Sequence, residues 1–291
     1  MKAQLSIFMD SGAYSLRDQG ADSSYLAAYA RFIRRHHESI DLYANFDVIG
    51  DPDRTWRNQT QLEFQFGIRP VPVVHNGTHP RWLGRYLNAG HGVVALGGLA
   101  GKTSRRSCRR WLDQCFKLLT KYPNVKVHGF GISSVEAVNS YPWYSVDTAA
   151  WTRRAGDGQI FVPHKKARRF IFDKASRKVQ PEQGVDHDTA EWLNSVGVAL
   201  GTYKPEGGVE TPGVITCYHE RRGANLRYFE ALSRQCGVKF YFSGNATHHD
   251  YEPENYLSGE VNVMPSFYAI NDVGHQRQRF DHIMKQRKGG N

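Results

Sequence analysis

Three aspartates each stand directly after a short apolar run of strand length. Asp10 follows QLSIFM, Asp47 follows IDLYANF and Asp147 follows YSV. A single aspartate in such a place often caps the next helix. Carboxylates gathered at one place repel each other, and such clusters are typical of sites that do acid–base or nucleophilic chemistry. The other polar or turn-forming residues at the ends of apolar runs are His75, Gly97, Gly98 and His128.

The segment SVDTAAWTRRAGDGQIF, residues 145–161, places two arginines shortly after one of these acids. Asp147 ends the apolar run, and Arg153 and Arg154 come before a Gly-Asp-Gly turn. A carboxylate followed by cations can have a purely structural role. It can also be a nucleophile beside a site that holds phosphate groups.

Apolar runs alternate with segments of helical spacing in the first half of the chain, which predicts βαβ units and a parallel sheet. The fold expected is a (β/α)8 TIM barrel forming one domain over residues 1–291. An open doubly wound sheet is the alternative, although no GxGxxG follows the first strand. Barrel active sites lie at the carboxyl ends of the strands, where all the residues above fall. We expect strands at 4–9, 40–46, 71–75, 92–96, 125–131 and 144–147, and helices at 23–38, 53–67, 80–90, 104–122 and 133–140.

The second half of the chain is less regular. Residues 164–190 are rich in charge and predict an insertion or long loop. The apolar runs 213–219 and 238–244 predict the last two barrel strands, with a helix at 223–237 between them. Residues 275–291 are expected to form a basic helix or tail.

Charge and composition indicate a globular protein with a polyanionic partner. The 291 residues carry a formal net charge of +10, which favours nucleic acid ahead of an anionic membrane. The apolar runs are too short for a membrane span, and residues 1–10 do not resemble a signal peptide. The four cysteines form no CxxC pair and suit a reducing cytoplasm. Cys108 and Cys115 share one predicted helix and suit packing.

Six motifs, FMDSGAYS, NFDVI, VVHNG, ALGGLAGK, HGFGIS and SVDTAAWTRRAGDGQIF, follow one another at the predicted strand ends. Their order resembles that of the tRNA-guanine transglycosylase superfamily over roughly residues 5 to 161. The short chain and its divergent second half are most similar to the DpdA-type DNA-guanine transglycosylases of phages and bacteria. These enzymes exchange guanine in DNA for a free 7-deazaguanine base such as preQ0.

One departure from the superfamily concerns zinc. Its members usually carry a CxCxxC motif and a histidine that together bind zinc. The segment TCYHERRGANLRYFEAL resembles the part holding that histidine, which makes His219 its counterpart. The three cysteines are missing, so no zinc site and no other metal or cofactor is expected.

The resemblance implies a nucleophile and an acid–base group. Asp147 corresponds to the nucleophile, and a carboxylate below the sugar can trap C1′ as a covalent intermediate, as retaining glycosidases do. Asp10 corresponds to the general acid and base for the departing and incoming nucleobase.

The resemblance also implies a set of base-binding residues. Asp47 would accept hydrogen bonds from the Watson–Crick edge of guanine, whose N1–H and N2–H₂ are adjacent donors. Asn76 would contact the base carbonyl, where the family commonly has Gln. Side chains would stack on the two faces of the base, and backbone groups would meet its exocyclic substituents. These remaining members of the set are Ser11, Tyr14, Gly97, Gly98, Leu99 and His128, with Tyr14 and His128 stacking.

Basic residues after the nucleophile would hold the nucleic-acid backbone on either side of a flipped-out base in duplex DNA. Those in residues 164–190 suit a solvated loop equally well. Two other functions remain open: the same exchange in tRNA, and a non-catalytic nucleic-acid-binding paralogue. The presence of both Asp10 and Asp147 argues against the second. The oligomeric state stays open. The basic residues concerned are Arg153, Arg154, Lys165, Lys166, Arg168 and Arg169.

Overall fold

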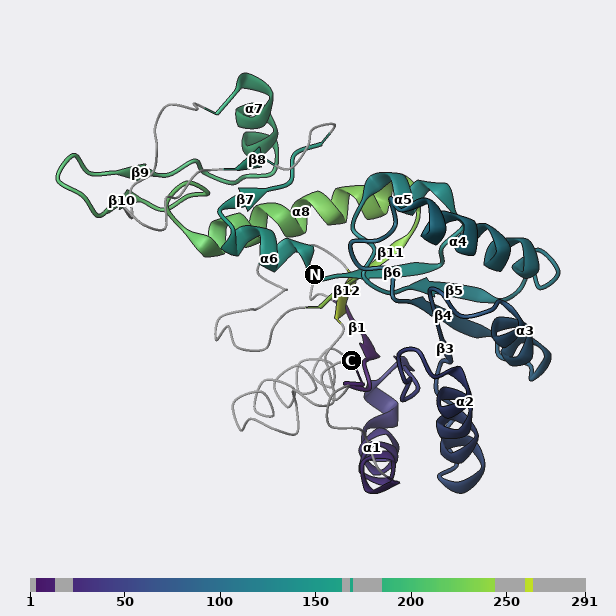
Figure 1. The fold of residues 1–291 in the computed structure, drawn as a ribbon. Coiled ribbons are helices and arrows are strands. Elements are labelled where there is room, and N and C mark those ends of the chain that lie inside the picture. Colours follow the sequence, from purple (N-terminus) through teal and green to yellow (C-terminus); the bar gives the residue numbers. More distant parts are fainter. Residues whose placement is uncertain (1–3, 14–22, 164–167, 170–184, 244–259, 264–291) are drawn as a thin grey trace. The chain divides into compact units, whose positions relative to one another are not determined.

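The computed structural model describes residues 4–13, 23–163, 168–169, 185–243 and 260–263 (Figure 1). By its contacts the chain divides into two compact units. The first, here the sheet unit, comprises residues 1–148, 238–251 and 259–291. The second, here the helical unit, comprises residues 149–237 and 252–258.

The sheet unit is an α/β fold in which strands of a parallel sheet alternate with helices. Its strands are β1 (Gln4–Met9), β2 (Leu42–Tyr43), β3 (Val73–His75), β4 (Val93–Gly97), β5 (Lys126–Gly129), β6 (Ser145–Thr148), β11 (Lys239–Phe242) and β12 (Glu260–Val263). Its helices are α1 (Ser23–His36), α2 (Pro52–Thr60), α3 (Arg81–Asn88), α4 (Arg106–Leu119) and α5 (Val135–Ser140), with a 3₁₀ turn η1 (His37–Ser39) and a π-helical turn η2 (Gln61–Gln65).

The strands follow the order β2-β1-β12-β11-β6-β5-β4-β3, and every neighbouring pair is parallel. Beyond the ends of this order, Ala44 after β2 and Val71 before β3 form a parallel bridge. The Asn45 N–H donates to the Val71 carbonyl at 2.9 Å, and the Val71 N–H donates to the Tyr43 carbonyl at 2.8 Å. Because the strands are parallel, their carboxyl ends share one edge of the sheet.

The six strands and five helices predicted for the first half are confirmed, and most of them are shorter than predicted or shifted by one residue. Local signals explain several of the ends. Asp51 caps α2 by accepting a hydrogen bond from the Arg54 N–H at 2.8 Å, and Pro52 begins the helix. Cys108 and Cys115 are buried on α4, as packing residues should be.

The predicted strand at 213–219 is wrong. The helix α8 (Tyr218–Cys236) begins within that segment, and β12 joins the parallel sheet beside β11. Val214 of this segment is buried with Ile160 and Leu193 in a small core of the helical unit, and the partly buried Ile215 packs against that core. The predicted strand at 238–244 is confirmed as β11.

An apolar cluster lies on one face of the parallel sheet, formed by buried side chains that include Phe8, Val73, Ala95 and Tyr241. Side chains two positions apart in a strand point to the same face. The residue two positions beyond each of these four therefore lies on the same face at the carboxyl edge. Those residues are Asp10, His75, Gly97 and Ser243.

The helical unit contains the helices α6 (Ala150–Gly156), α7 (His187–Ser195) and α8, and the antiparallel strand pairs β7 (Gln159–Ile160) with β8 (Arg168–Arg169) and β9 (Thr202–Tyr203) with β10 (Val209–Thr211). The helices α6 and α8 are linked by Asn225, whose Nδ2 donates to the Trp151 carbonyl at 2.9 Å.

Much of the predicted insertion, 164–190, and all of the basic tail, 275–291, lie outside the described residues. No helix in the described parts of the chain has both the length and the apolar character needed to cross a membrane.

Candidate active site

The carboxyl edge of the parallel sheet brings three predicted aspartates within electrostatic reach of one another. The pKa of Asp10 is raised from 3.8 to about 7, first by burial and then by the negative charges of Asp47 and Asp147. A hydrogen bond from the Gly12 N–H to Oδ1 of Asp10, at 3.3 Å, opposes this rise. An acid with such a pKa can both hold and release a proton near neutral pH.

Asp147 is buried, and each of its carboxylate oxygens accepts a hydrogen bond. The Gly131 N–H donates to Oδ1 at 2.5 Å, and Oγ of Ser243 donates to Oδ2 at 3.0 Å. Burial raises the pKa of Asp147 to about 6, and the two hydrogen bonds hold it lower than burial alone would. The two hydrogen bonds fix the orientation of the carboxylate. Because each carboxylate oxygen has two lone pairs, electron pairs are still available on it.

His128 lies next to Asp147, with its Nε2 3.8 Å from Oδ1. Its Nδ1 is 2.9 Å from Oγ of Ser145, and the rings of Phe8 and Phe130 meet it edge-on at centroid distances of 4.7 Å. Burial lowers the pKa of His128 to about 3, so the ring is neutral. No part of His128 is exposed, and stacking on a base, as the resemblance implies, would require its neighbours to move.

A hydrogen bond joins Asp47, which follows β2, to His75, which ends β3. Nε2 of His75 contacts Oδ2 of Asp47, and 14% and 13% of the two side chains are exposed. Nδ1 of His75 is buried and has no hydrogen-bond partner among the described residues. The sequence placed His75 at this edge without giving it a role.

The Gly97–Gly98 turn lies against the ring of His75. A Cβ on Gly97 would stand 3.2 Å from Cε1 of His75, and one on Gly98 would stand 3.3 Å from Nδ1. Gly98 also has a φ of 70°, which favours glycine. The backbone N–H of Asn76 donates to the Gly97 carbonyl at 2.9 Å, so the backbone of Asn76 lies at the same turn.

The remaining predicted base-binding residues differ in their surroundings. Leu99 is fully buried. Ser11 is also fully buried, and its carbonyl accepts a hydrogen bond from the Tyr25 hydroxyl at 3.0 Å. Tyr14 lies outside the described residues.

The predicted phosphate-binding residues belong to the helical unit. Arg153 and Arg154 are exposed on α6, and Arg154 donates to Oε1 of Gln159 at 3.0 Å. Arg168 and Arg169 form β8, while Lys165 and Lys166 lie outside the described residues.

His219, the counterpart of the zinc-binding histidine that the resemblance implies, belongs to no metal-binding cluster in the described part of the chain. His219 lies in the first turn of α8, where its ring is 5.5 Å from that of Tyr218. Among the described residues, no three His, Cys, Asp or Glu side chains gather so that they could hold a metal ion.

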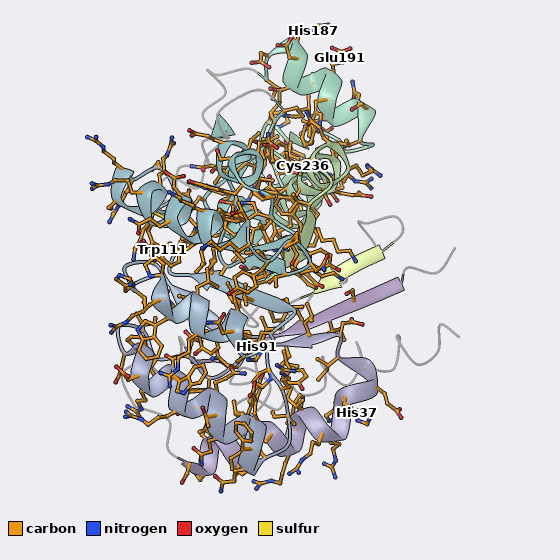
Figure 2. All side chains as sticks on the ribbon, turned by 90° about the vertical axis from the view of Figure 1, so that its right-hand side faces the viewer. His37, His91, Trp111, His187, Glu191 and Cys236 are labelled. Carbon is orange, nitrogen blue, oxygen red and sulfur yellow. The ribbon has the colours of Figure 1, made fainter. Side chains whose placement is uncertain are left out.

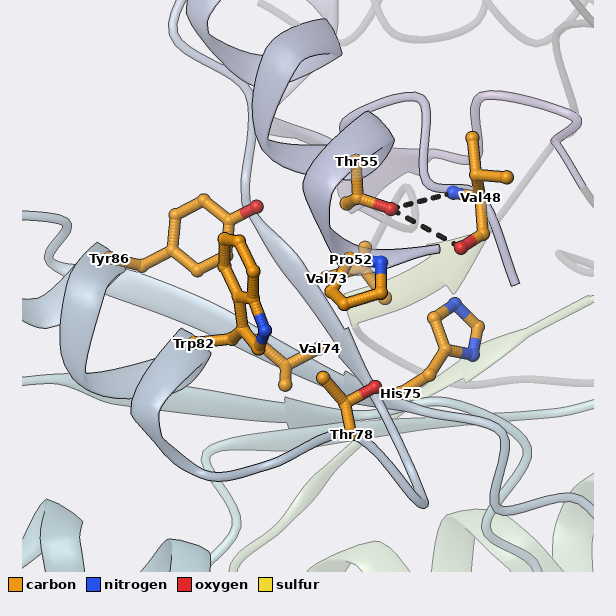
Figure 3. A pocket seen from close by; sticks show the side chains of 9 residues that line it. All are labelled: Val48, Pro52, Thr55, Val73, Val74, His75, Thr78, Trp82 and Tyr86. Carbon is orange, nitrogen blue, oxygen red and sulfur yellow. Dashed lines mark hydrogen bonds between the residues drawn. The ribbon is translucent and has the colours of Figure 1, made fainter. Parts of the chain in front are cut away.

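An apolar pocket lies beside His75, between β3, α2 and α3 (Figure 3). Its wall includes Thr55, whose Oγ1 accepts a hydrogen bond from the Val48 N–H at 2.8 Å. The sequence did not predict this pocket. The lining residues are Val48, Pro52, Thr55, Val73, Val74, His75, Thr78, Trp82 and Tyr86.

Two residues that hydrogen-bond to Asp147 were given no role by the sequence analysis. Ser243 stands directly after β11, as Asp10 stands after β1, and this position is the signal that could have found it. Gly131 contributes a backbone N–H, which no residue type reveals. No protein-family model matches the chain, and no curated protein matches its sequence.

Proposed function

We propose that this chain is a base-exchange transglycosylase that replaces guanine in DNA with a free 7-deazaguanine base such as preQ0. The observation that carries the proposal is the combination of two unlike carboxyl groups at one edge of the sheet. Asp147 is fixed by hydrogen bonds to both oxygens, and Asp10 has a pKa near 7. Carboxyl groups whose surroundings give them different proton affinities suit separate nucleophile and acid roles.

The proposed exchange has two steps. Asp147 attacks C1′ of the nucleotide, the bond from C1′ to N9 of guanine breaks, and Asp10 gives its proton to the departing base. The incoming base then loses a proton to Asp10 and attacks C1′, which releases Asp147 as a carboxylate. The glycosidic bond is broken and remade without water, and Asp10 ends protonated as it began.

The strand pairings support a closed eight-stranded barrel as the frame for this chemistry. Parallel pairing continues through eight strands, and the Ala44–Val71 bridge links the segments beyond the two ends of that order. Closure would place the carboxyl ends of all the strands around one opening, which is where (β/α)8 enzymes carry their active sites. Asp47 would there accept hydrogen bonds from the Watson–Crick edge of guanine.

The net charge of +10 and the exposed Arg153 and Arg154 support a nucleic-acid substrate. The choice of DNA rests on the resemblance to the DpdA-type enzymes. Selectivity would come from groove shape and from the 2′-hydroxyl, which only RNA carries.

The test is incubation of the protein with radiolabelled preQ0 or guanine and either duplex DNA or tRNA. We expect label to enter DNA, with less or none in tRNA, and a covalent protein–DNA adduct that survives denaturation. Label in tRNA alone would transfer the assignment to a tRNA enzyme. If neither polymer gains label while the protein still binds DNA, the non-catalytic alternative would replace the proposal.

A further inference from the structure

We propose that His75 is a base-binding residue whose Nδ1 accepts a hydrogen bond from an N–H group of the bound nucleobase. This inference rests on the proposed function. His75 ends β3 two positions after Val73, which belongs to the apolar cluster on the same sheet face. Its ring is therefore directed toward the edge where the three aspartates lie.

The contact with Asp47 determines which ring nitrogen carries the proton. An ionised carboxylate can only accept hydrogen bonds, so Nε2 of His75 donates to Oδ2 of Asp47. In a neutral imidazole the other nitrogen, Nδ1, then carries a lone pair and acts as an acceptor. Asp47 and His75 together offer acceptors, and the buried Nδ1 has no partner among the described residues.

Nδ1 is buried against the Gly97–Gly98 turn, so a base that reaches it must displace this turn. A Cβ on Gly97 would stand 3.4 Å from Nδ1, and one on Gly98 would stand 3.3 Å from it. A buried acceptor that stays unpaired destabilises a fold by the cost of its desolvation. A ligand that donates a hydrogen bond there would remove this cost.

Guanine and 7-deazaguanine suit such a group of acceptors. Both carry adjacent N1–H and N2–H₂ donors, and the oxygen of Asp47 left free by His75 can accept one of them. Hypoxanthine lacks the amino group, so one buried acceptor would stay unpaired. Sites built to hydrogen-bond a substrate N–H discriminate strongly against analogues without it.

The decisive variant is His75→Gln. A glutamine amide can reach the position of Nε2 and still donate to Asp47, but it places nothing at Nδ1. We expect the KM for radiolabelled guanine, measured by guanine-for-guanine exchange into duplex DNA, to rise by at least tenfold with a smaller change in kcat. If His75 only orients Asp47, the KM will stay at the wild-type value, and the inference is overturned.

The matched control is His91→Gln. His91, labelled in Figure 2, also pairs with an acid, its Nε2 lying 3.2 Å from Oε1 of Glu63. It precedes β4, whereas His75 ends a strand. This control should leave the KM for guanine unchanged. Thermal melting of both variants shows whether each one folds.

A measurement on the wild-type protein covers the case in which His75→Gln does not fold. In a protein with ¹⁵N-labelled histidine, added guanine should shift the Nδ1 resonance of His75 as its lone pair accepts a hydrogen bond. An unchanged resonance at saturating guanine would overturn the inference. Failure of the wild-type protein to exchange guanine into any polymer would instead refute the proposed function. The exchange assay thus tests the proposed function, and the histidine resonance tests the role of His75.

Discussion

In the proposed exchange Asp147 attacks the sugar and Asp10 transfers the proton, and the surroundings of the two groups differ in a way that suits these roles. Asp147 is held by donors from two different segments, while Asp10 is raised in pKa mainly by burial and then by its acidic neighbours. Neither environment follows from the residue type.

Asp147→Asn should abolish base exchange and the covalent DNA adduct while leaving the fold intact. An asparagine can accept from the Gly131 N–H and pair with Ser243, and it removes a charge that burial disfavours. Denaturing gels detect the adduct, and thermal melting reports the fold. An adduct of wild-type intensity in a folded variant would show that another residue attacks the sugar.

Adduct formation should be fastest between about pH 6 and 7. The nucleophile is lost as pH falls through the pKa of Asp147, about 6, because the carboxylate becomes protonated. The acid is lost as pH rises through the pKa of Asp10, about 7. Single-turnover rates across pH 5 to 9 test this, and a rate that keeps rising above pH 8 would remove Asp10 from the role of acid.

Asp10→Asn should make the protein more stable at pH 8 and flatten the dependence of its stability on pH. The folded pKa of Asp10 lies above its unfolded value of 3.8, so the folded state binds more protons between these two values. This group's contribution to stability is therefore greatest below pH 4 and falls as pH rises to about 7. Urea unfolding of the wild type and the variant at pH 4 and pH 8 measures the difference, and equal pH slopes would contradict it.

The strand ends act as supports for these side chains. The donor to Oδ1 of Asp147 follows β5, the donor to Oδ2 follows β11, and the turn after β4 leaves room for the ring at the end of β3. Each support comes from a different strand of one parallel sheet. Small changes in one strand end should therefore alter a side chain on another.

Gly97→Ala should raise the KM for guanine without loss of the fold. The added Cβ would stand 3.1 Å from Cγ1 of Val73 and 3.2 Å from Cε1 of His75, so the imidazole must shift. Gly92→Ala is the control, because Gly92 directly precedes β4, at the end opposite Gly97, and nothing stands within 4 Å of its added Cβ. Equal KM values for both variants would show that the ring tolerates the contact.

The molecule carries a large positive charge, and this property should govern its affinity for nucleic acid. DNA binding should weaken steeply with salt, and Arg153→Ala should reduce the slope of log K against log salt by about 0.9, the value for one phosphate contact. Lys121→Ala, which removes an exposed charge just beyond α4, is the matched control. Fluorescence anisotropy at several salt concentrations gives both slopes, and identical slopes would exclude Arg153 from the interface.

The sequence by itself determined the alternating elements of the first half and the position of the three aspartates at strand ends. Both follow from local patterns, namely the spacing of apolar residues and the polar and turn-forming residues that end each element. The strand predicted at 213–219 from the same pattern is wrong, because an apolar run does not reveal which cluster will bury it. That segment packs with Ile160 and Leu193 in the helical unit, and Glu260–Val263 takes the place beside β11.

Only the tertiary structure decided how the site is held together. Ser243 and Asp147 are 96 positions apart in the chain, and Asp47 and His75 are 28 apart. No local pattern encodes such contacts, because the parallel sheet brings together segments separated by whole helices. The backbone N–H of Gly131 and the buried Nδ1 of His75 are likewise defined by packing, since every residue has an N–H and only its surroundings decide what it donates to.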